Sequence, residues 1–243
     1  MLLPLLQACL NGNRAAAEHP ALPLAPAELA ADAVRVRAAG AGAVHVHVKD
    51  AGGADTLDGE LLAQVLAAVR AAAPGLAVGV TTGAWSAPDP ARRVAAVRGW
   101  TALPDVASVN WHEPGAEQVA AVLLERGVGI EAGLWHADAV RTWLASPLRS
   151  RCLRVLLELP DGLDARETAE QADRLLGLLA GGSEAPVLLH GEGSSAWPAL
   201  RHAAARGLAT RIGLEDVLTL PDGSPAPDNA ALVAAARALV RAR

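Results

Sequence analysis

The chain has 243 residues, a formal net charge of −5 and 52% hydrophobic residues, which excludes a disordered polypeptide and indicates a large buried core. Lys49 is the only lysine and no basic run occurs, which excludes a nucleic-acid partner because phosphate binding needs clustered Lys and Arg. The length fits one domain covering residues 1–243. We therefore expect a globular domain that binds a small molecule.

The first ten residues are apolar, but they lack a basic start and too few of them precede Cys9 for a secretion signal, so we predict a strand there. No uninterrupted apolar run reaches the ~20 residues that span a bilayer, so we expect no membrane partner. Cys9 and Cys152 lie in apolar runs typical of buried strands, which argues against a disulfide and favours a reducing cytoplasm.

Short apolar runs alternate with amphipathic stretches of helical length along the whole chain, a pattern typical of repeated βα units around a parallel sheet. Strands are predicted at residues 3–10, 43–48, 76–81, 106–110, 129–134, 153–159, 186–190 and 210–214. Helices are predicted at residues 26–39, 60–73, 90–100, 116–126, 137–145, 165–179, 196–206 and 229–241. Each strand is followed by one helix.

This alternation fits a single (β/α)8 TIM barrel or an open doubly wound sheet. Polar residues follow the predicted strands one after another, and functional side chains of barrels sit at the C-terminal ends of the strands. The polar strand ends are Asn11, His47, Lys49, Asp50, Thr81, Thr82, Asn110, His112, Glu131, Glu158, His190, Glu192, Glu215 and Asp216. We therefore favour the barrel, an α/β fold, over the open sheet.

The His45-Val46-His47 triplet ends the second predicted strand. Side chains alternate faces along a strand, so both imidazoles point the same way while Val46 points the other. Two imidazoles on one face at a strand end are a platform for zinc or a related metal. The alternative is a pair of neutral, hydrogen-bonded histidines inside the barrel.

Glu215 is the candidate third ligand, because in a closed barrel the eighth strand lies only two strands from the second. By the same alternation Arg211 shares its face, so a carboxylate and a guanidinium would project into one cavity. The alternative is a surface cluster of Arg211, Glu215 and Asp216. Two His and one Glu would leave coordination positions open, as catalytic zinc sites do.

Several blocks resemble the β-keto acid cleavage enzymes, whose founding member cleaves 3-keto-5-aminohexanoate. The matching blocks are Asn11-Gly12-Asn13-Arg14, His19-Pro20-Ala21-Leu22-Pro23, Pro26-Ala27-Glu28, Ala39-Gly40-Ala41-Gly42-Ala43, His45-Val46-His47-Val48-Lys49-Asp50, Thr56-Leu57-Asp58, Arg211-Ile212-Gly213-Leu214-Glu215-Asp216 and residues 225–232. The resemblance covers nearly the whole chain. It implies a homo-oligomeric zinc enzyme in which a β-keto acid and acetyl-CoA give acetoacetate and a new CoA ester.

The resemblance also implies roles for single residues. His45, His47 and Glu215 would bind Zn²⁺, Arg211 and Asp216 would form a catalytic pair that orients and deprotonates the substrate, and Thr81 would contact the substrate carboxylate. We add four further candidate substrate-binding residues: Thr82, Arg14, Asn110 and Glu131. For Glu131 the alternative to substrate binding is a structural role.

Departures from the family pattern leave the substrate open. The chain is shorter than usual, and Ala84 followed by bulky Trp85 stands where a second glycine is expected. His112 is a reserve metal ligand. The loop at residues 190–195 is either a phosphate site that receives CoA or a loop in which Ser195 caps the next helix.

Two rival functions remain at the level of the sequence. One is a metal-dependent hydrolase of the amidohydrolase type, which carries its His-x-His on the first strand rather than the second. The other is a barrel that binds metal without catalysis.

Overall fold

The computed structural model describes residues 5–241, in which strands and helices alternate from one end to the other. The strands are β1 (Leu6–Cys9), β2 (Ala43–Val46), β3 (Ala77–Thr81), β4 (Val106–Asn110), β5 (Gly129–Leu134), β6 (Arg154–Leu159), β7 (Val187–Gly191) and β8 (Thr210–Ile212). The helices are α1 (Pro26–Ala39), α2 (Gly59–Ala72), α3 (Pro90–Gly99), α4 (Ala116–Glu125), α5 (Ala137–Ala145), α6 (Ala165–Ala180), α7 (Ala196–Arg206) and α8 (Asn229–Arg241). Three short 3-10 helices lie at Ala16–Glu18, Arg149–Arg151 and Gly193–Ser195.

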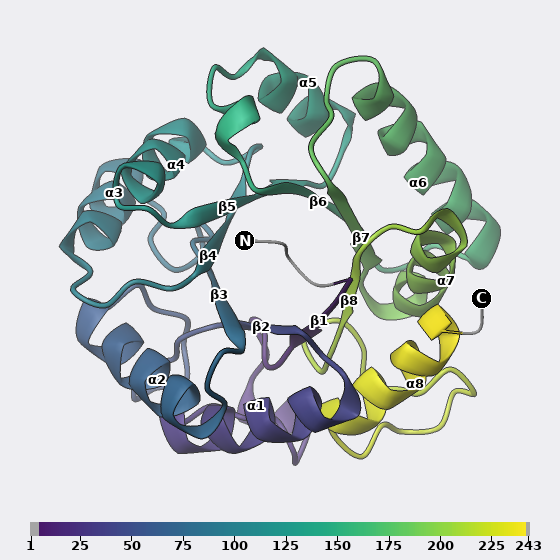
Figure 1. Ribbon diagram of the computed structural model, residues 1–243, viewed down its shortest axis with the longest axis horizontal. Helices are drawn as coiled ribbons and strands as arrows, with labels where there is room; N and C mark the ends of the chain where they lie inside the picture. Colours follow the sequence, from purple (N-terminus) through teal and green to yellow (C-terminus); the bar gives the residue numbers. More distant parts are fainter. Residues whose placement is uncertain (1–4, 242–243) are drawn as a thin grey trace.

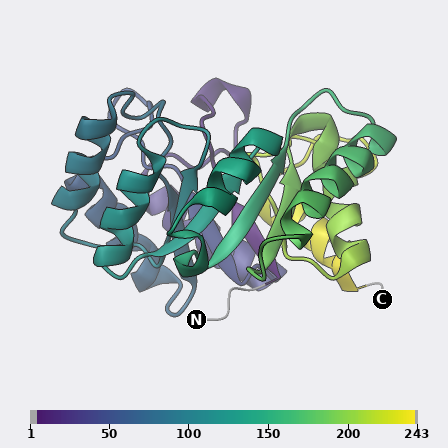
Figure 2. The ribbon, with the colours of Figure 1, turned by 90° about the horizontal axis from the view of Figure 1, so that it is seen from above.

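The strands form one parallel sheet in the order β7-β6-β5-β4-β3-β2-β1-β8. β7 and β8 close the ring through a parallel bridge between Leu188 and Ala209, where the Leu189 N–H donates to the Ala209 carbonyl across 2.9 Å. Looking down the ring, the helices surround the strands (Figure 1), and from the side they stand along the outside of the sheet (Figure 2). The predicted (β/α)8 TIM barrel is confirmed.

The apolar core lies between the strands and the surrounding helices. Val44 and Val46 of β2 are fully buried there, as are Leu62 and Val69 on the inner face of α2. α2 begins after Asp58, whose carboxylate accepts from the N–H groups of Glu60 and Leu61. Outward-facing valines therefore hold β2 against the helices and leave His45 facing the inside of the barrel.

Three strands end earlier than predicted: β1 by one residue and β2 and β8 by two. After Val46 the side chain of Asn11 replaces the backbone ladder, because its amide group donates to the carbonyl of His47 and accepts from the N–H of His47, both at 2.9 Å. β8 stops at Ile212. The next residue, Gly213, lies so close to the Cys9 backbone that a Cβ there would collide with it, and its carbonyl accepts turn hydrogen bonds from the N–H groups of Asp216 and Val217. The predicted start of the first strand at residue 3 lies outside the described residues.

Within residues 5–241, no helix is both long enough and apolar enough to cross a lipid bilayer.

Candidate metal centre

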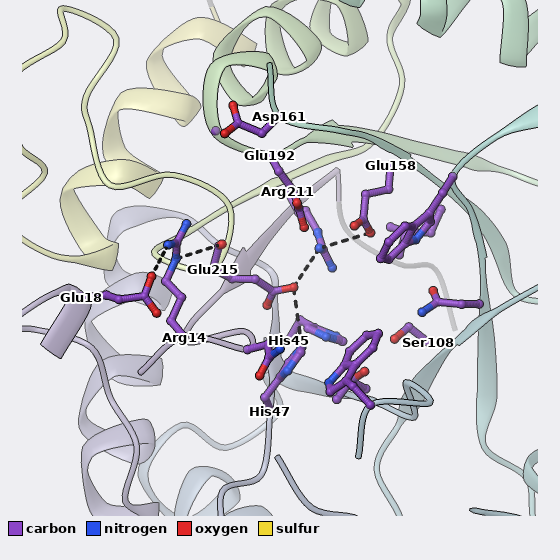
Figure 3. A pocket seen from close by; sticks show the side chains of 17 residues that line it. Arg14, Glu18, His45, His47, Ser108, Glu158, Asp161, Glu192, Arg211 and Glu215 are labelled. Atoms are coloured by element: carbon purple, nitrogen blue, oxygen red, sulfur yellow. Dashed lines mark hydrogen bonds and ion pairs between the residues drawn. The ribbon is translucent and has the colours of Figure 1, made fainter. Parts of the chain in front are cut away.

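A cavity of about 380 Å³ opens at the C-terminal ends of the strands (Figure 3). Seven of the residues predicted for the site line it: Arg14, His45, His47, Thr81, Asn110, Arg211 and Glu215. They come from β2, β3, β4, β8 and the segments that follow β1, β2 and β8. The cavity is therefore where the barrel fold predicts a functional site.

His45, His47 and Glu215 meet on one side of this cavity. Each offers one ligand atom, and these atoms all lie within 4.8 Å of one another. The two imidazole rings pack edge to face with their centroids 5.3 Å apart, and His47 Nε2 is 3.7 Å from Glu215 Oε1. Figure 3 shows both rings and the carboxylate turned toward one another.

The chemistry of these three residues fits a divalent metal. In the described part of the chain, His45 Nδ1 and Glu215 Oε2 are buried and accept or donate no hydrogen bond. Burial lowers the pKa of His45 to about 3, so this imidazole is neutral at pH 7. Burial alone would raise the pKa of Glu215, but Arg211, His45 and His47 bring it down to about 2. Neutral imidazoles and an ionised carboxylate are what zinc binds.

A second grouping, Cys9 with Glu215 and Asp216, lies within the same distance limit but is filled by a guanidinium. Arg211 Nη2 donates to Glu215 Oε1 at 2.9 Å and to Asp216 Oδ1 at 3.3 Å. Burial also raises the pKa of the Cys9 thiol well above its usual value, so the thiolate that metals prefer is disfavoured. The histidine cluster is the better metal site.

Arg211 is the centre of a buried charge network behind the metal cluster. Its Nε donates to His190 Nδ1 at 3.1 Å, and its Nη2 lies 3.8 Å from Glu158 Oε2. His190 in turn lies between Glu158, 3.3 Å from Nε2, and Asp216, 3.4 Å from Nδ1. One guanidinium thus faces three carboxylates, those of Glu158, Glu215 and Asp216.

Glu192 lies at the edge of this network, and its carboxyl group has a raised pKa. Burial, followed by the nearby carboxylates of Glu158 and Asp216, raises the pKa of Glu192 to about 8. The pKa of Glu158 is lowered instead. Burial would raise it, but the hydrogen bond and charge of His190 and the charge of Arg211 bring it below its usual value. Two neighbouring carboxyl groups therefore have opposite protonation states at neutral pH.

The remaining predicted residues differ in their access to the cavity. Arg14 lies at the rim, where it pairs with Glu18 at 2.8 Å and donates to the backbone of Leu214 and Glu215. Thr81 and Asn110 also line the cavity, and Asn110 donates to Glu113 at 2.9 Å.

Thr82, Glu131 and Asp216 are not among the lining residues. The Thr82 hydroxyl donates to the Ser108 carbonyl at 2.7 Å. Glu131 is fully buried and accepts from Arg154 Nε at 2.6 Å, while Asp216, also fully buried, lies against Arg211 and His190. Each of the three is thus held by contacts within the protein.

Sequence reasoning did not assign a role to three residues that the structure brings to the site: Asp55, Glu158 and Glu192. Glu158 and Glu192 carried a signal, since both follow the pattern of polar strand ends. Asp55 carried none, because it comes from the loop between β2 and α2.

The loop at residues 190–195 has its backbone donors occupied. The N–H of Ser194 donates to Asp161 at 2.7 Å, that of Gly193 to the Asp216 carbonyl and that of Ser195 to the Glu192 carbonyl. A phosphate would meet the Asp161 carboxylate there instead of free donors. The Ser195 hydroxyl donates to the carbonyls of Leu159 and Glu192 and makes no side-chain cap on α7, so the predicted helix cap was wrong.

The model of one protein family, described as beta-keto acid cleavage enzyme, matches residues 5–243. The chain belongs to the beta-keto acid cleavage enzyme family. No curated protein matches it. The resemblance inferred from the sequence motifs is thereby confirmed.

Solved structures of this fold include ObcA. The apo structure of ObcA matches with a TM-score of 0.72 at 18% identity, over 90% of this chain and 61% of that one. Its ternary complex with a C4-CoA adduct and oxalate matches with a TM-score of 0.69 at 18% identity, over 90% and 63%. 3-Dehydroquinate dehydratase from Geobacillus kaustophilus matches with a TM-score of 0.61 at 10% identity, over 98% and 92%. This beta-keto acid cleavage family member thus spans about six-tenths of the ObcA chain.

Proposed function

We propose that this protein is a zinc-dependent β-keto acid cleavage enzyme, an acyltransferase that uses acetyl-CoA. The net reaction transfers the acyl group of R–CO–CH2–COO⁻ to CoA and the acetyl group of acetyl-CoA to the remaining two-carbon unit. The products are acetoacetate and R–CO–SCoA, so atoms and charge balance. The observation that carries this proposal is the meeting of His45, His47 and Glu215 beside Arg211 in a chain of this family.

His45, His47 and Glu215 would hold the metal, which supplies Lewis acidity toward a substrate oxygen when bound. Arg211 sits where a fixed guanidinium would attract the substrate carboxylate, because its Nη2 reaches the ligand Glu215 from the cavity wall. Asp216 would orient Arg211 from behind and take part in proton transfer as its partner.

Thr81 and Asn110 are polar lining residues of the cavity and would contact the substrate, with Arg14 at the rim. We assign Thr82 and Glu131 to the support of the cavity wall. The CoA part of the proposal is supported by the family and by ObcA, whose complexes contain oxaloacetate and a C4-CoA adduct. A homo-oligomer in the cytoplasm completes the proposal.

The test is a panel of β-keto acids incubated with labelled acetyl-CoA, with products identified by mass spectrometry. We expect labelled acetoacetate and one new acyl-CoA from at least one acid, and neither product from the His45→Ala variant. Metal-dependent cleavage of esters or amides without CoA exchange would favour the hydrolase instead. Inertness toward all classes, with metal bound, would favour a barrel that holds metal without catalysis.

A further inference from the structure

The carboxylate of Asp55 lies directly behind His47. The side chain is 2% exposed, and its Oδ2 is 2.6 Å from His47 Nδ1. Asp55 comes back to this position because the loop after β2 folds onto itself: Lys49 pairs with Asp55 in an antiparallel bridge, and the Asp50 N–H donates to the Ala54 carbonyl at 2.8 Å. Gly53, with a φ of 81°, makes the turn between them.

This contact fixes which nitrogen of His47 is available to a metal. A carboxylate accepts and does not donate, so Nδ1 carries the proton and donates to Asp55. The lone pair of Nε2 then points into the cluster, where Glu215 Oε1 lies 3.7 Å away (Figure 3). Carboxylates behind ligating histidines hold the ring orientation and raise the basicity of the ligand.

Two further donors hold Asp55 in place. Lys49 Nζ donates to its Oδ1 at 2.5 Å and to the Gly12 carbonyl at 2.7 Å. The indole N–H of Trp85 donates to Oδ2 at 2.7 Å. Asp55 is thus bonded to His47 and Lys49 of the segment that follows β2 and to Trp85 of the loop after β3. Lys49 links this group to the loop after β1 through the Gly12 carbonyl.

Trp85 also covers the other side of His47. The two rings stack with centroids 6.0 Å apart and planes 15° from parallel. The indole folds over Gly83, where a Cβ would collide with it. Trp85, which lines the cavity and is 40% exposed, therefore lies close enough to the cluster to report on a metal held there.

We propose that Asp55 is the positioning residue of the metal centre, holding His47 in the ligating tautomer and orientation, and that Trp85 completes this support from the cavity side. The proposal rests on the metal centre of the proposed function, but it concerns affinity for the metal and not turnover.

The experiment measures zinc affinity by chelator competition in the full chain, for wild type, Asp55→Asn, Asp50→Asn and His45→Ala. We expect Asp55→Asn to bind zinc about 10- to 100-fold more weakly than wild type, the usual effect of removing such a partner. Asp50→Asn is the matched control, because Asp50 lies in the same loop, bonds only backbone N–H groups and loses the same charge. It should stay within about twofold of wild type, by the small effects typical of surface changes.

A second readout uses Co²⁺ and tryptophan fluorescence. Cobalt bound at the cluster should quench tryptophan fluorescence in wild type. Trp85→Phe should weaken that quenching while still binding Co²⁺, as judged by its visible absorption, and Trp135, which lines the same cavity, remains in both proteins. Asp55→Asn should shift the visible bands at saturating Co²⁺, whereas loss of folding would abolish them.

The outcomes distinguish a failure of the metal centre from a failure of the positioning role of Asp55. If wild type and His45→Ala bind zinc alike, or neither binds it, the metal centre is wrong and this proposal with it. If wild type binds zinc and Asp55→Asn binds it equally well, only the positioning role is overturned. Equal weakening in Asp55→Asn and Asp50→Asn would also overturn it, because the effect would then belong to the loop.

Discussion

Arg211 donates to Glu215 at 2.9 Å, so the carboxylate that completes the candidate metal cluster is also an acceptor for a buried guanidinium. Glu215 Oε2 remains without a hydrogen bond among the described residues. One oxygen of Glu215 is therefore held by the protein and the other is left for a ligand. This division explains how a carboxylate can be oriented and still bind a metal.

Replacing Arg211 by Met should destabilise the protein by about 3–5 kcal/mol, the usual cost of removing one partner from a buried ion pair. The reason is that Glu158, Glu215 and Asp216 would then face one another without their shared cation. Urea unfolding measures the change. Arg166→Met, at an exposed i,i+4 pair on α6, is the control and should leave the stability close to that of wild type. Equal stabilities of Arg211→Met and wild type would contradict this account of the network.

Glu131→Gln should behave as a structural and not a substrate-binding change. Glu131 is fully buried with Arg154 and does not line the cavity, so we expect a loss of about 3–5 kcal/mol in unfolding free energy with zinc affinity unchanged. Asp138→Asn, at the exposed pair with Arg141, is the control and should leave the stability close to that of wild type. A raised KM in a fully stable Glu131→Gln protein would instead place Glu131 among the substrate contacts.

Glu192 should make the stability of the protein fall as pH rises. Its pKa is about 8 in the folded chain against 4.5 ordinarily, so between these values the folded state holds a proton that the unfolded state has lost. Stability from this group is therefore complete below about pH 4.5 and is lost progressively up to pH 8, with a slope of at most about 1.4 kcal/mol per pH unit. His190, Glu158 and Asp216 are the titratable groups that face it.

The measurement is urea unfolding of wild type and Glu192→Gln between pH 5 and 8. Because Gln cannot ionise, the variant should gain stability relative to wild type as pH increases. Glu60→Gln, at an exposed position in the first turn of α2, should show no such trend. A pH-independent difference for Glu192→Gln would show that Glu192 ionises normally.

Most of the fold could be predicted from the sequence because strands buried on both faces are continuous apolar runs. The predicted bounds of β4 and β5 coincide with those observed. The ends of β2 and β8 could not be predicted, since one depends on the Asn11 side chain and the other on the close approach of Gly213 to Cys9. Such contacts join residues far apart in the chain.

The candidate site could also be predicted only in part from the sequence. Alternation along the predicted strand at residues 43–48 placed His45 and His47 on one face, and the two rings are in contact although β2 ends at Val46. Glu215 was expected to reach the cavity by the same alternation, but β8 ends at Ile212 and Glu215 enters from the turn that follows. Asp55 could not be predicted, because only the pairing of Lys49 with Asp55 returns the loop to His47.

The central claim is that His45, His47 and Glu215 hold one divalent metal, and zinc content per chain tests it most directly. Glu215→Gln and Asp216→Asn form a matched pair, because the two carboxylates are adjacent and both accept from Arg211, but only Glu215 lies in the histidine cluster. We predict about one equivalent of zinc in wild type and in Asp216→Asn, turnover lost in Asp216→Asn, and zinc lost in Glu215→Gln. Equal zinc in wild type and Glu215→Gln would contradict the ligand assignment.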